Sequence, residues 1–264
     1  MLPRAFLTLM LLAGLPGIAG AADGQMEIGP TCAAVGCSSG DAAGYPISIT
    51  TAGSYILTGP LAPTGSLRAI QITAADVTVD LNGFAITGPG SGAAVGIWSN
   101  GQRVAIRNGI VRDMGSHGIE ITQHGARVED VSAHDNGGDG ILVTIGAHVA
   151  RCNVRSNGSE GIRTSTGSVV VQNVAVLNGA DGIRTSGSVV GNVALNNGGD
   201  GLDVSSGLVR DNTVRLSTGF GLDGGTQVAY GGNLFVNNNG GGDQVDTGPI
   251  DAGGNVCSTD TICP

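Results

Sequence analysis

The chain of 264 residues contains no lysine, and its twelve arginines are outnumbered by twenty-one aspartates and glutamates. The formal net charge is −9 at pH 7. This balance argues against nucleic acid as a partner, because affinity for nucleic acid comes from basic groups that neutralise phosphates. The absence of lysine also excludes any mechanism that needs a lysine nucleophile.

Aromatic residues make up only 3% of the chain and charged residues only 12%, whereas glycine occurs 48 times. This composition is typical of neither an ordinary helical domain nor a charged disordered tail. Hydrophobic residues still account for 41%, mostly valine, isoleucine, leucine and alanine. We therefore predict an all-β fold whose core consists of small and β-branched side chains.

Long apolar runs are missing except at the N-terminus. There Arg4 precedes the run AFLTLMLLAGLPGIAG, and small residues follow it. We interpret residues 1–21 as a Sec-type signal peptide that is cleaved after Ala21. The run contains glycine and proline and is shorter than the roughly 20 residues of a membrane-spanning helix. We expect a secreted or periplasmic protein without a membrane span.

The five cysteines form two close pairs and one isolated residue. We expect a local disulfide in each pair, Cys32–Cys37 and Cys257–Cys263. Such bonds persist in an oxidising compartment and fit export. Zinc-binding pairs are the alternative, but the spacings fit them poorly and no histidine lies beyond His148. We interpret Cys152 as a small buried residue.

A glycine followed by isoleucine or leucine recurs along the chain. It stands at Gly96, Gly118, Gly140, Gly161, Gly182, Gly201 and Gly221. The spacings are 22, 22, 21, 21, 19 and 20 residues. Each unit holds short apolar runs between clusters of Asn, Gly, Ser and Asp, which predicts strands joined by sharp bends. The repeat predicts stacked coils; an antiparallel meander, which Asn-Gly pairs ordinarily favour, is the alternative.

In stacked coils each strand pairs in parallel with its copies about 4.8 Å above and below, so equivalent residues form columns. One buried column is predicted at Ile97, Ile119, Ile141, Ile162, Ile183, Leu202 and Leu222. A second is predicted at Val131, Val154, Val174 and Val193. An inward asparagine column, with side-chain amides bonded between coils, is predicted at Asn108, Asp130, Asn153, Asn173, Asn192, Asn212 and Asn233. Glycine is expected to supply the positive φ of the corners.

These repeats, together with ITTAGSYILTGPL and VTVDLNGFAITGPG, resemble the secreted bacterial right-handed parallel β-helix proteins of the pectin-lyase-like superfamily. The resemblance covers about 47–248. It implies a right-handed parallel β-helix of about eight or nine coils, with an N-terminal cap and a C-terminal disulfide loop. The expected parts are a signal peptide (1–21), an N-terminal segment and cap (22–63), the solenoid (64–248) and the terminal loop (249–264). The fold leaves the activity open, because lyases, hydrolases, epimerases and adhesins share it.

The motifs of the superfamily's enzymes are absent. Of the set that is typical of polygalacturonases only His117-Gly118 is found, and Asn212-Thr213 is followed by Val214. Neither the Asp-Pro-His of alginate epimerases nor the Trp-Ile-Asp-His of pectate lyases occurs. Whether the protein is an enzyme therefore stays open; if it is one, a polysaccharide lyase or glycoside hydrolase is expected.

Alternate residues of the repeated strands should face solvent. The outer column is predicted at Trp98, Glu120, Leu142, Arg163, Arg184, Asp203 and Asp223. Its ligand-binding candidates are Trp98, Glu120, Arg163 and Arg184. Arginines on adjacent coils suit paired hydrogen bonds with the carboxylates of an acidic glycan.

The residue before each anchor glycine forms a neighbouring column, with carboxylates at Asp139, Glu160, Asp181 and Asp200. Stacked carboxylates repel one another unless they are neutralised. Turn chemistry with local ion pairs is the first interpretation. The alternative is a calcium site formed by these four residues, which would free the arginines; no other cofactor is expected.

His117 precedes Asp139 in this column, and the two form the candidate catalytic acid–base pair. A solvated histidine at a polar turn is the alternative. Three functions therefore compete: a non-catalytic exported β-helix that binds glycans or another surface, a lyase or hydrolase of acidic polysaccharides with an unrecognised site, and a purely structural repeat protein. We favour the first, because the near absence of sugar-stacking aromatics weighs most against a long catalytic cleft. The oligomeric state is not indicated.

Overall fold

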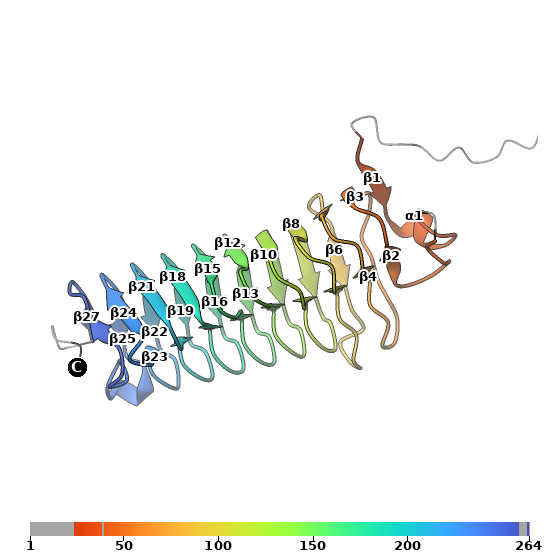
Figure 1. The fold of residues 1–264 in the computed structure, drawn as a ribbon. Helices are drawn as coiled ribbons and strands as arrows, with labels where there is room; N and C mark the ends of the chain where they lie inside the picture. The colour runs from red at the N-terminus through yellow and green to blue at the C-terminus, as the bar shows by residue number, and fades with distance from the viewer. Residues whose placement is uncertain (1–23, 39, 259–262, 264) are drawn as a thin grey trace, which may run out of the picture.

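The computed structural model describes residues 24–38, 40–258 and 263. The predicted signal peptide lies outside the described residues. The described chain winds into an elongated stack of coils, with β1 (Met26–Ile28) at one end and β27 (Val256–Cys257) at the other (Figure 1). Every strand pairing is parallel, as stacked coils require. The predicted parallel solenoid is confirmed, and the antiparallel alternative is wrong.

One face of the solenoid is a nine-stranded sheet with one strand per coil. Its strands are β2 (Ile47–Ile49), β4 (Ile70–Ile72), β7 (Ile97–Ser99), β9 (Ile119–Ile121), β11 (Ile141–Val143), β14 (Ile162–Arg163), β17 (Ile183–Thr185), β20 (Leu202–Val204) and β23 (Leu222–Gly224). A further bridge joins Leu222 to Val245. The stack therefore has about ten turns, slightly more than the predicted number.

The opposite side is an eighteen-stranded sheet that is folded at a bend. Its early strands are β1, β3 (Gly53–Leu57), β5 (Val77–Asp80), β6 (Ala85–Thr87), β8 (Ala105–Arg112) and β10 (Arg127–His134). From there on each coil contributes one strand before the bend and one after it. The first arm contains β12 (His148–Ala150), β15 (Ser168–Val171), β18 (Gly187–Val190), β21 (Gly207–Arg210), β24 (Val228–Gly231) and β26 (Ile250–Asp251). The second arm contains β13 (Asn153–Arg155), β16 (Val174–Val176), β19 (Val193–Leu195), β22 (Thr213–Arg215), β25 (Leu234–Val236) and β27.

The helical elements among the described residues are short: α1 (Pro30–Ala33) and the 3-10 turn η1 (Asn239–Gly241). None of the helices in this part of the chain is long and apolar enough to cross a membrane. At the N-terminal end, β1 pairs with β3 and β3 pairs with β5. The segment 22–63 thus contributes strands that continue the parallel stack.

The core lies between the two sheets, and its aliphatic column in the nine-stranded sheet is confirmed. All seven predicted members from Ile97 to Leu222 are fully buried. The predicted valine column is wrong. Val131 and Val154 are buried but lie in different columns, because Val154 pairs with Ala133, and Val174 and Val193 are 36% and 38% exposed. Val154 pairs with Ala175 rather than with Val174, and a shift of one residue turns a side chain to the other face.

An inward asparagine ladder exists, but it begins later than predicted. Asn173 donates from Nδ2 to Asn192 Oδ1 at 3.0 Å and to the Val149 carbonyl at 3.0 Å. The same pattern continues through Asn212, Asn233 and Asn255. The predicted members Asn108 and Asp130 instead take the left-handed bend with φ of 60° and 55°, and Asn153 is exposed.

A second asparagine ladder, which the sequence analysis did not predict, runs along the turn before the nine-stranded sheet. Its side chains are linked at 2.9 to 3.0 Å through Asn136, Asn157, Asn178 and Asn197. The anchor glycines pack against it: a Cβ on Gly161 would lie 2.7 Å from Asn178 Nδ2. These glycines are therefore needed for close approach, whereas residues such as Arg151 and Gln172 adopt the positive φ of the bends.

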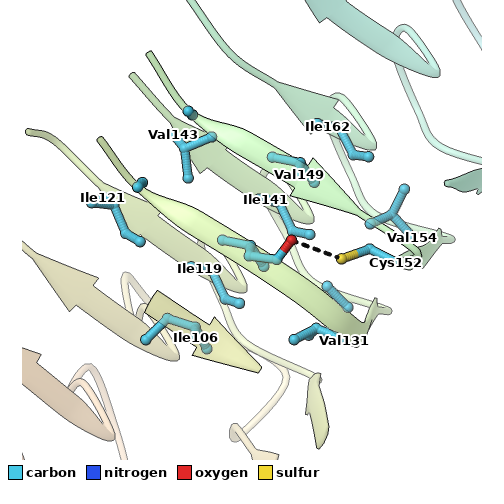
Figure 2. Close-up of a cluster of buried hydrophobic side chains, with 14 of the residues drawn as sticks. Ile106, Ile119, Ile121, Val131, Ile141, Val143, Val149, Cys152, Val154 and Ile162 are labelled. Atoms are coloured by element: carbon cyan, nitrogen blue, oxygen red, sulfur yellow. Dashed lines mark hydrogen bonds between the residues drawn. The ribbon is translucent and has the colours of Figure 1, made fainter. Parts of the chain in front are cut away.

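Both expected disulfides are present, Cys32–Cys37 and Cys257–Cys263. Cys152 is free and buried, as expected, and occupies the first place of the asparagine ladder, where its N–H donates to Asn173 Oδ1 at 2.8 Å. Its thiol lies among aliphatic side chains such as Val131, Ile141 and Val154 (Figure 2). Burial raises the pKa of this thiol to about 12, so that it stays protonated.

Candidate functional site

The register of the nine-stranded sheet places the predicted outer column in one row. Cα pairings run through Trp98, Glu120, Leu142, Arg163, Arg184, Asp203 and Asp223. Arg163 and Arg184 are exposed, and the remaining members are partly buried. The two arginines therefore project from adjacent coils, whereas Trp98 and Glu120 lie on earlier coils.

Trp98 has a cation of this chain against its ring. The guanidinium carbon of Arg68 lies 4.1 Å from the ring centroid, and Arg68 Nη1 donates to Gln71 Oε1 at 2.8 Å. This cation–π contact occupies the ring face on which a sugar would stack. The structure does not bring Trp98 together with the arginines.

The connection from the nine-stranded sheet to the first arm changes length along the stack. Val149, Val170, Val189, Val209 and Tyr230 hold equivalent positions in the first arm. They follow the first residue of the corresponding strand in the nine-stranded sheet by 8, 8, 6, 7 and 8 residues in successive coils. These first residues are Ile141, Ile162, Ile183, Leu202 and Leu222. Two adjacent coils thus have shortened connections, at Thr185–Gly187 and Val204–Gly207.

The shortened connections leave a hollow on the surface, which we call the notch. One part of about 260 Å³ is lined by Arg163, Thr164, Arg184, Thr185, Ser186, Asp203 and Ser205. The adjoining part of about 290 Å³ is lined by Thr166, Gly167, Ser168, Val169, Ser186, Gly187, Ser188, Ser206 and Gly207. Ser186 belongs to both parts, so they meet there. The notch combines two arginines with a floor and walls rich in hydroxyl groups.

The two arginines of the notch differ in their partners. Arg184 lies between two carboxylates: its Nη1 is 3.5 Å from Glu160 Oε1, and its Nε is 3.1 Å from Asp203 Oδ2. The Arg163 side chain makes no hydrogen bond and no ion pair within 4 Å with any residue that the structure describes, although its charge helps to lower the pKa of Glu160. Its guanidinium is therefore available to an anionic ligand, whereas that of Arg184 is held within the protein.

Hydroxyl groups also stack from coil to coil within the notch. Thr164 Oγ1 and Thr185 Oγ1 are 2.5 Å apart, and Ser186 and Ser205 share a short hydrogen bond between their side-chain oxygens. Thr164 and Thr185 are buried, whereas Ser186 is half-buried and Ser205 is exposed. A hydroxyl group can both donate and accept, so Ser186 and Ser205 can exchange hydrogen bonds with the hydroxyls of a sugar.

The acidic column lies beside the notch, and its carboxylates accept backbone N–H groups of the next coil. Asp139 Oδ1 accepts from Glu160 at 3.2 Å, and Asp181 Oδ1 accepts from Asp200 at 2.8 Å. Asp200 Oδ1 accepts from the N–H of Phe220 at 2.6 Å. Among the described residues, no three Asp, Glu, His or Cys side chains converge in the way a metal ion needs. This geometry favours the turn-chemistry interpretation over calcium.

Burial raises the pKa of several of these carboxyl groups. The pKa of Asp200 rises to about 6, mainly through burial, with the negative charges of Asp181 and Asp223 adding to the effect. Burial also raises the pKa values of Asp181 and Asp203. The acidic side of the notch therefore loses charge in mildly acidic solution.

The structure brings the candidate catalytic pair together. His117 Nδ1 lies 3.6 Å from Asp139 Oδ2, but it accepts the backbone N–H of Asp139 at 2.9 Å. The neutral ring therefore carries its proton on Nε2. A general base oriented by a carboxylate needs the opposite arrangement, with Nδ1–H donating to Asp139. The pair is adjacent, but its hydrogen bonding suits a turn better than proton transfer.

The notch as a surface feature was missed from the sequence, although the sequence carried a signal for it. The two shortest anchor spacings, 19 and 20 residues, belong to the two coils with shortened connections. The repeat alone does not say which part of a coil has lost residues, so the short spacings do not by themselves point to the arginines. The Cα pairings of the first arm locate the loss in the connection.

Several solved structures share this architecture. The A-module of the Azotobacter vinelandii mannuronan C-5 epimerase AlgE6 matches with 18% identity and a TM-score of 0.58, over 81% of this chain and 66% of that one. The AlgE4 A-module of the same organism matches with 17% identity and a TM-score of 0.59, over 81% and 67%. The Dettilon tailspike protein gp208 matches with 14% identity and a TM-score of 0.50, over 80% and 59%. The chain spans about two thirds of the epimerase modules, and at these identities the likeness concerns the fold alone.

No curated protein sequence matched the chain. The family model described as "Right handed beta helix region" matches residues 93–256, which is more than half of the chain. This match agrees with the observed parallel coils and with the resemblance to the pectin-lyase-like superfamily. The chain belongs to the right-handed β-helix family.

Proposed function

We propose that the protein is an exported, non-catalytic β-helix that binds an acidic glycan at the notch, with Arg163 as the anchor for a carboxylate of the glycan. The observation that carries this proposal is the state of Arg163. It is exposed, it has no ion-pair partner among the described residues, and it borders a hollow lined by hydroxyl groups. A planar guanidinium with free N–H groups is suited to paired hydrogen bonds with a carboxylate.

The surroundings of Arg163 support a sugar rather than a simple anion. The accessible hydroxyl side chains of Ser186 and Ser205 line the same hollow. Such groups match the alternating donors and acceptors of a saccharide, and bridging water can complete the contacts. The occurrence of this fold in mannuronan and alginate epimerases is consistent with a polysaccharide as ligand.

Export is supported by the two disulfides, because such bonds persist in oxidising compartments. The apolar run that follows Arg4 supports the same conclusion. An enzyme of acidic polysaccharides has less support. His117 accepts a backbone N–H at Nδ1, which does not suit a general base oriented by Asp139. Two other His–carboxylate contacts, His134–Asp135 and His148–Glu129, involve no residue that lines the notch.

Calorimetric titration with an acidic polyuronate tests this proposal, with a neutral glucan of similar length as the ligand control. Arg163→Ala should weaken polyuronate binding by about tenfold or more, because a charge-assisted contact is lost. The matched control is Arg210→Ala, which removes an exposed arginine from the first arm. If both variants lose the same affinity for the polyuronate, the loss comes from the change in net charge, and a specific site is contradicted.

The same titrations in calcium and in chelator separate the two interpretations of the acidic column. Binding at the notch without a metal should be the same in both solutions. Chromatography of the polyuronate after incubation tests for catalysis: shortened or unsaturated products that disappear in His117→Ala would replace the proposed function with a lyase or hydrolase.

A further inference from the structure

The outer face of the second arm carries many aliphatic side chains between β16 and β25, interrupted at β22 by Thr213 and Arg215. We call it the leucine face, and it comprises Val174, Val176, Leu177, Val193, Leu195, Leu216, Leu234 and Val236. Leu177 is 52% exposed, and Leu216 is 46% exposed. Parallel sheets are normally covered on both faces, and this one packs the core with only its inner face. The leucine face lies on a different side of the coil from the notch.

The aliphatic character is confined to these coils. Earlier coils carry charged or polar residues in the same columns: Arg155 pairs with Val176, and Asn153 pairs with Val174. Exposed apolar residues that are scattered singly need no explanation, but a continuous group of them indicates an interaction surface.

Backbone conformation gives an independent reason to assign a role to the two leucines. Leu177 and Leu216 occupy the bend after the second arm with φ of 57° and 59°. The equivalent residues in the coils between and beyond them are Asn196 and Asn237, which tolerate left-handed φ better than leucine does. Each leucine therefore destabilises the folded state in two ways: its backbone is left-handed, and its aliphatic side chain is exposed to solvent. The bend imposes left-handed φ on its residue in successive coils, so the choice of leucine at these two exposed positions is what calls for an explanation.

The order of side chains along this bend is symmetric. Successive coils present Ser156, Leu177, Asn196, Leu216 and Asn237, so Asn196 has a leucine on either side and polar residues beyond. We propose that the leucine face binds the same face of a second copy, with the coils antiparallel and a twofold axis near Asn196. Leu177 of one copy then packs on Leu216 of the other, as an isologous interface requires.

The neighbouring column fits the same axis over its three central coils, whereas at the edge Val236 lies opposite Arg155. Leu195 meets its own copy, and Val176 meets the aliphatic stem of Arg215, whose head reaches solvent. Five coils at about 4.8 Å span only about 20 Å, so the interface is smaller than that of a typical stable dimer. The net charge of −9 also opposes self-association. The dimer is therefore weak, and it strengthens with protein concentration and with salt.

Sedimentation velocity over a wide range of concentration and salt tests the dimer. Wild type should shift from monomer to dimer as either is raised. The double variant Leu177→Asn/Leu216→Asn should stay monomeric, with a melting temperature no lower than that of dilute wild type, because asparagine tolerates the left-handed backbone. Ile145→Asn removes an exposed isoleucine from another side of the coil and should dimerise as wild type does.

The orientation has its own test, because a twofold axis near Asn196 brings this residue close to its copy. Asn196→Cys should form an intermolecular disulfide under mild oxidation, and Ser156→Cys should not. A wild type that stays monomeric throughout, or a dimer that survives the double asparagine variant, would overturn the proposal. Both outcomes are independent of glycan binding at the notch.

Discussion

Buried asparagines in two ladders satisfy polar groups on adjacent coils. Asn173 is 1% exposed, and its amide contacts Cys152, Val149 and Asn192. Removal of this side chain leaves the Cys152 N–H without its partner in a dry interior and takes one hydrogen bond from the Val149 carbonyl. Such orphaned groups cost more than the net gain from one hydrogen bond.

Asn173→Ala should therefore lower the free energy of unfolding by about 1 to 3 kcal/mol. The matched control is Asn153→Ala, one coil earlier and exposed, which should cost less than about 0.5 kcal/mol. Asn238 would be a poor control despite its loop-like sequence, because it is fully buried in the second ladder. Thermal and denaturant melts decide, and equal stabilities of the two variants would contradict the ladder.

Asp200 gives a prediction about pH. Its folded-state pKa of about 6 lies above the ordinary value near 3.9, so the folded protein binds the proton more tightly than the unfolded chain. The stabilising contribution of this group to the free energy of unfolding is fully present below about pH 4 and is lost as pH rises through about 6. Stability should therefore increase when pH falls from 7.5 to 5.

Asp200→Asn should remove part of this dependence and stabilise the protein by about 1 kcal/mol at pH 7.5, after allowance for solvent screening. The amide oxygen can still accept the Phe220 N–H. Asp243→Asn, at an exposed position, serves as the control. If both variants give the same pH profile of melting temperature, the raised pKa of Asp200 has no role in stability.

At the level of elements, the repeat spacing predicted the parallel strands and one of the two aliphatic columns. It misplaced the early asparagines, because the left-handed bend residue and the ladder residue are adjacent in sequence and the repeat does not separate them. Asn108 and Asp130 take the first position, whereas Asn173 takes the second. A shift of one residue exchanges the inner and outer faces, so only the hydrogen-bond register settles the choice.

The connection between the two sheets is the element that creates the notch. An insertion of two residues, Ser and Thr, after Thr185 would restore the connection of that coil to the length found in the preceding coil. The variant should fold with a similar melting temperature, because surface loops tolerate short insertions. It should lose most polyuronate binding in calorimetry, while the same insertion after Thr226 should not affect it. Unchanged binding would show that the hollow is not the site.

One disulfide lies near each end of the stack, and Cys152 is isolated in the core. Alkylation of native, unreduced protein should label no cysteine, and unfolding without reductant should expose Cys152 alone. The reason is that the thiolate is the reactive form and burial raises the thiol pKa to about 12. Mass spectrometry of the labelled peptides reads out the result; rapid native labelling of Cys152 would contradict its buried position.

At the scale of the whole molecule, the fold was predictable because a solenoid repeats one local pattern many times. The site was predictable only in part. Arg163 and Arg184 are predictable as outward neighbours, but their unequal pairing depends on Glu160 and Asp203, which lie on the coils before and after that of Arg184. The notch arises from the length of two connections rather than from residue type. Trp98 is covered by Arg68, which lies more than one coil earlier in the sequence. The pairing of the arginines, the notch and the covering of Trp98 all depend on contacts between coils.

The central claim is that one face of this solenoid binds an acidic glycan at the notch. A crystal structure of the protein with a uronate oligosaccharide tests it most directly. One ligand should be bound in the hollow, with a carboxylate within hydrogen-bond distance of the Arg163 guanidinium and sugar hydroxyls on Ser186 and Ser205. A ligand bound on another face, or in the notch without contact to Arg163, would contradict it.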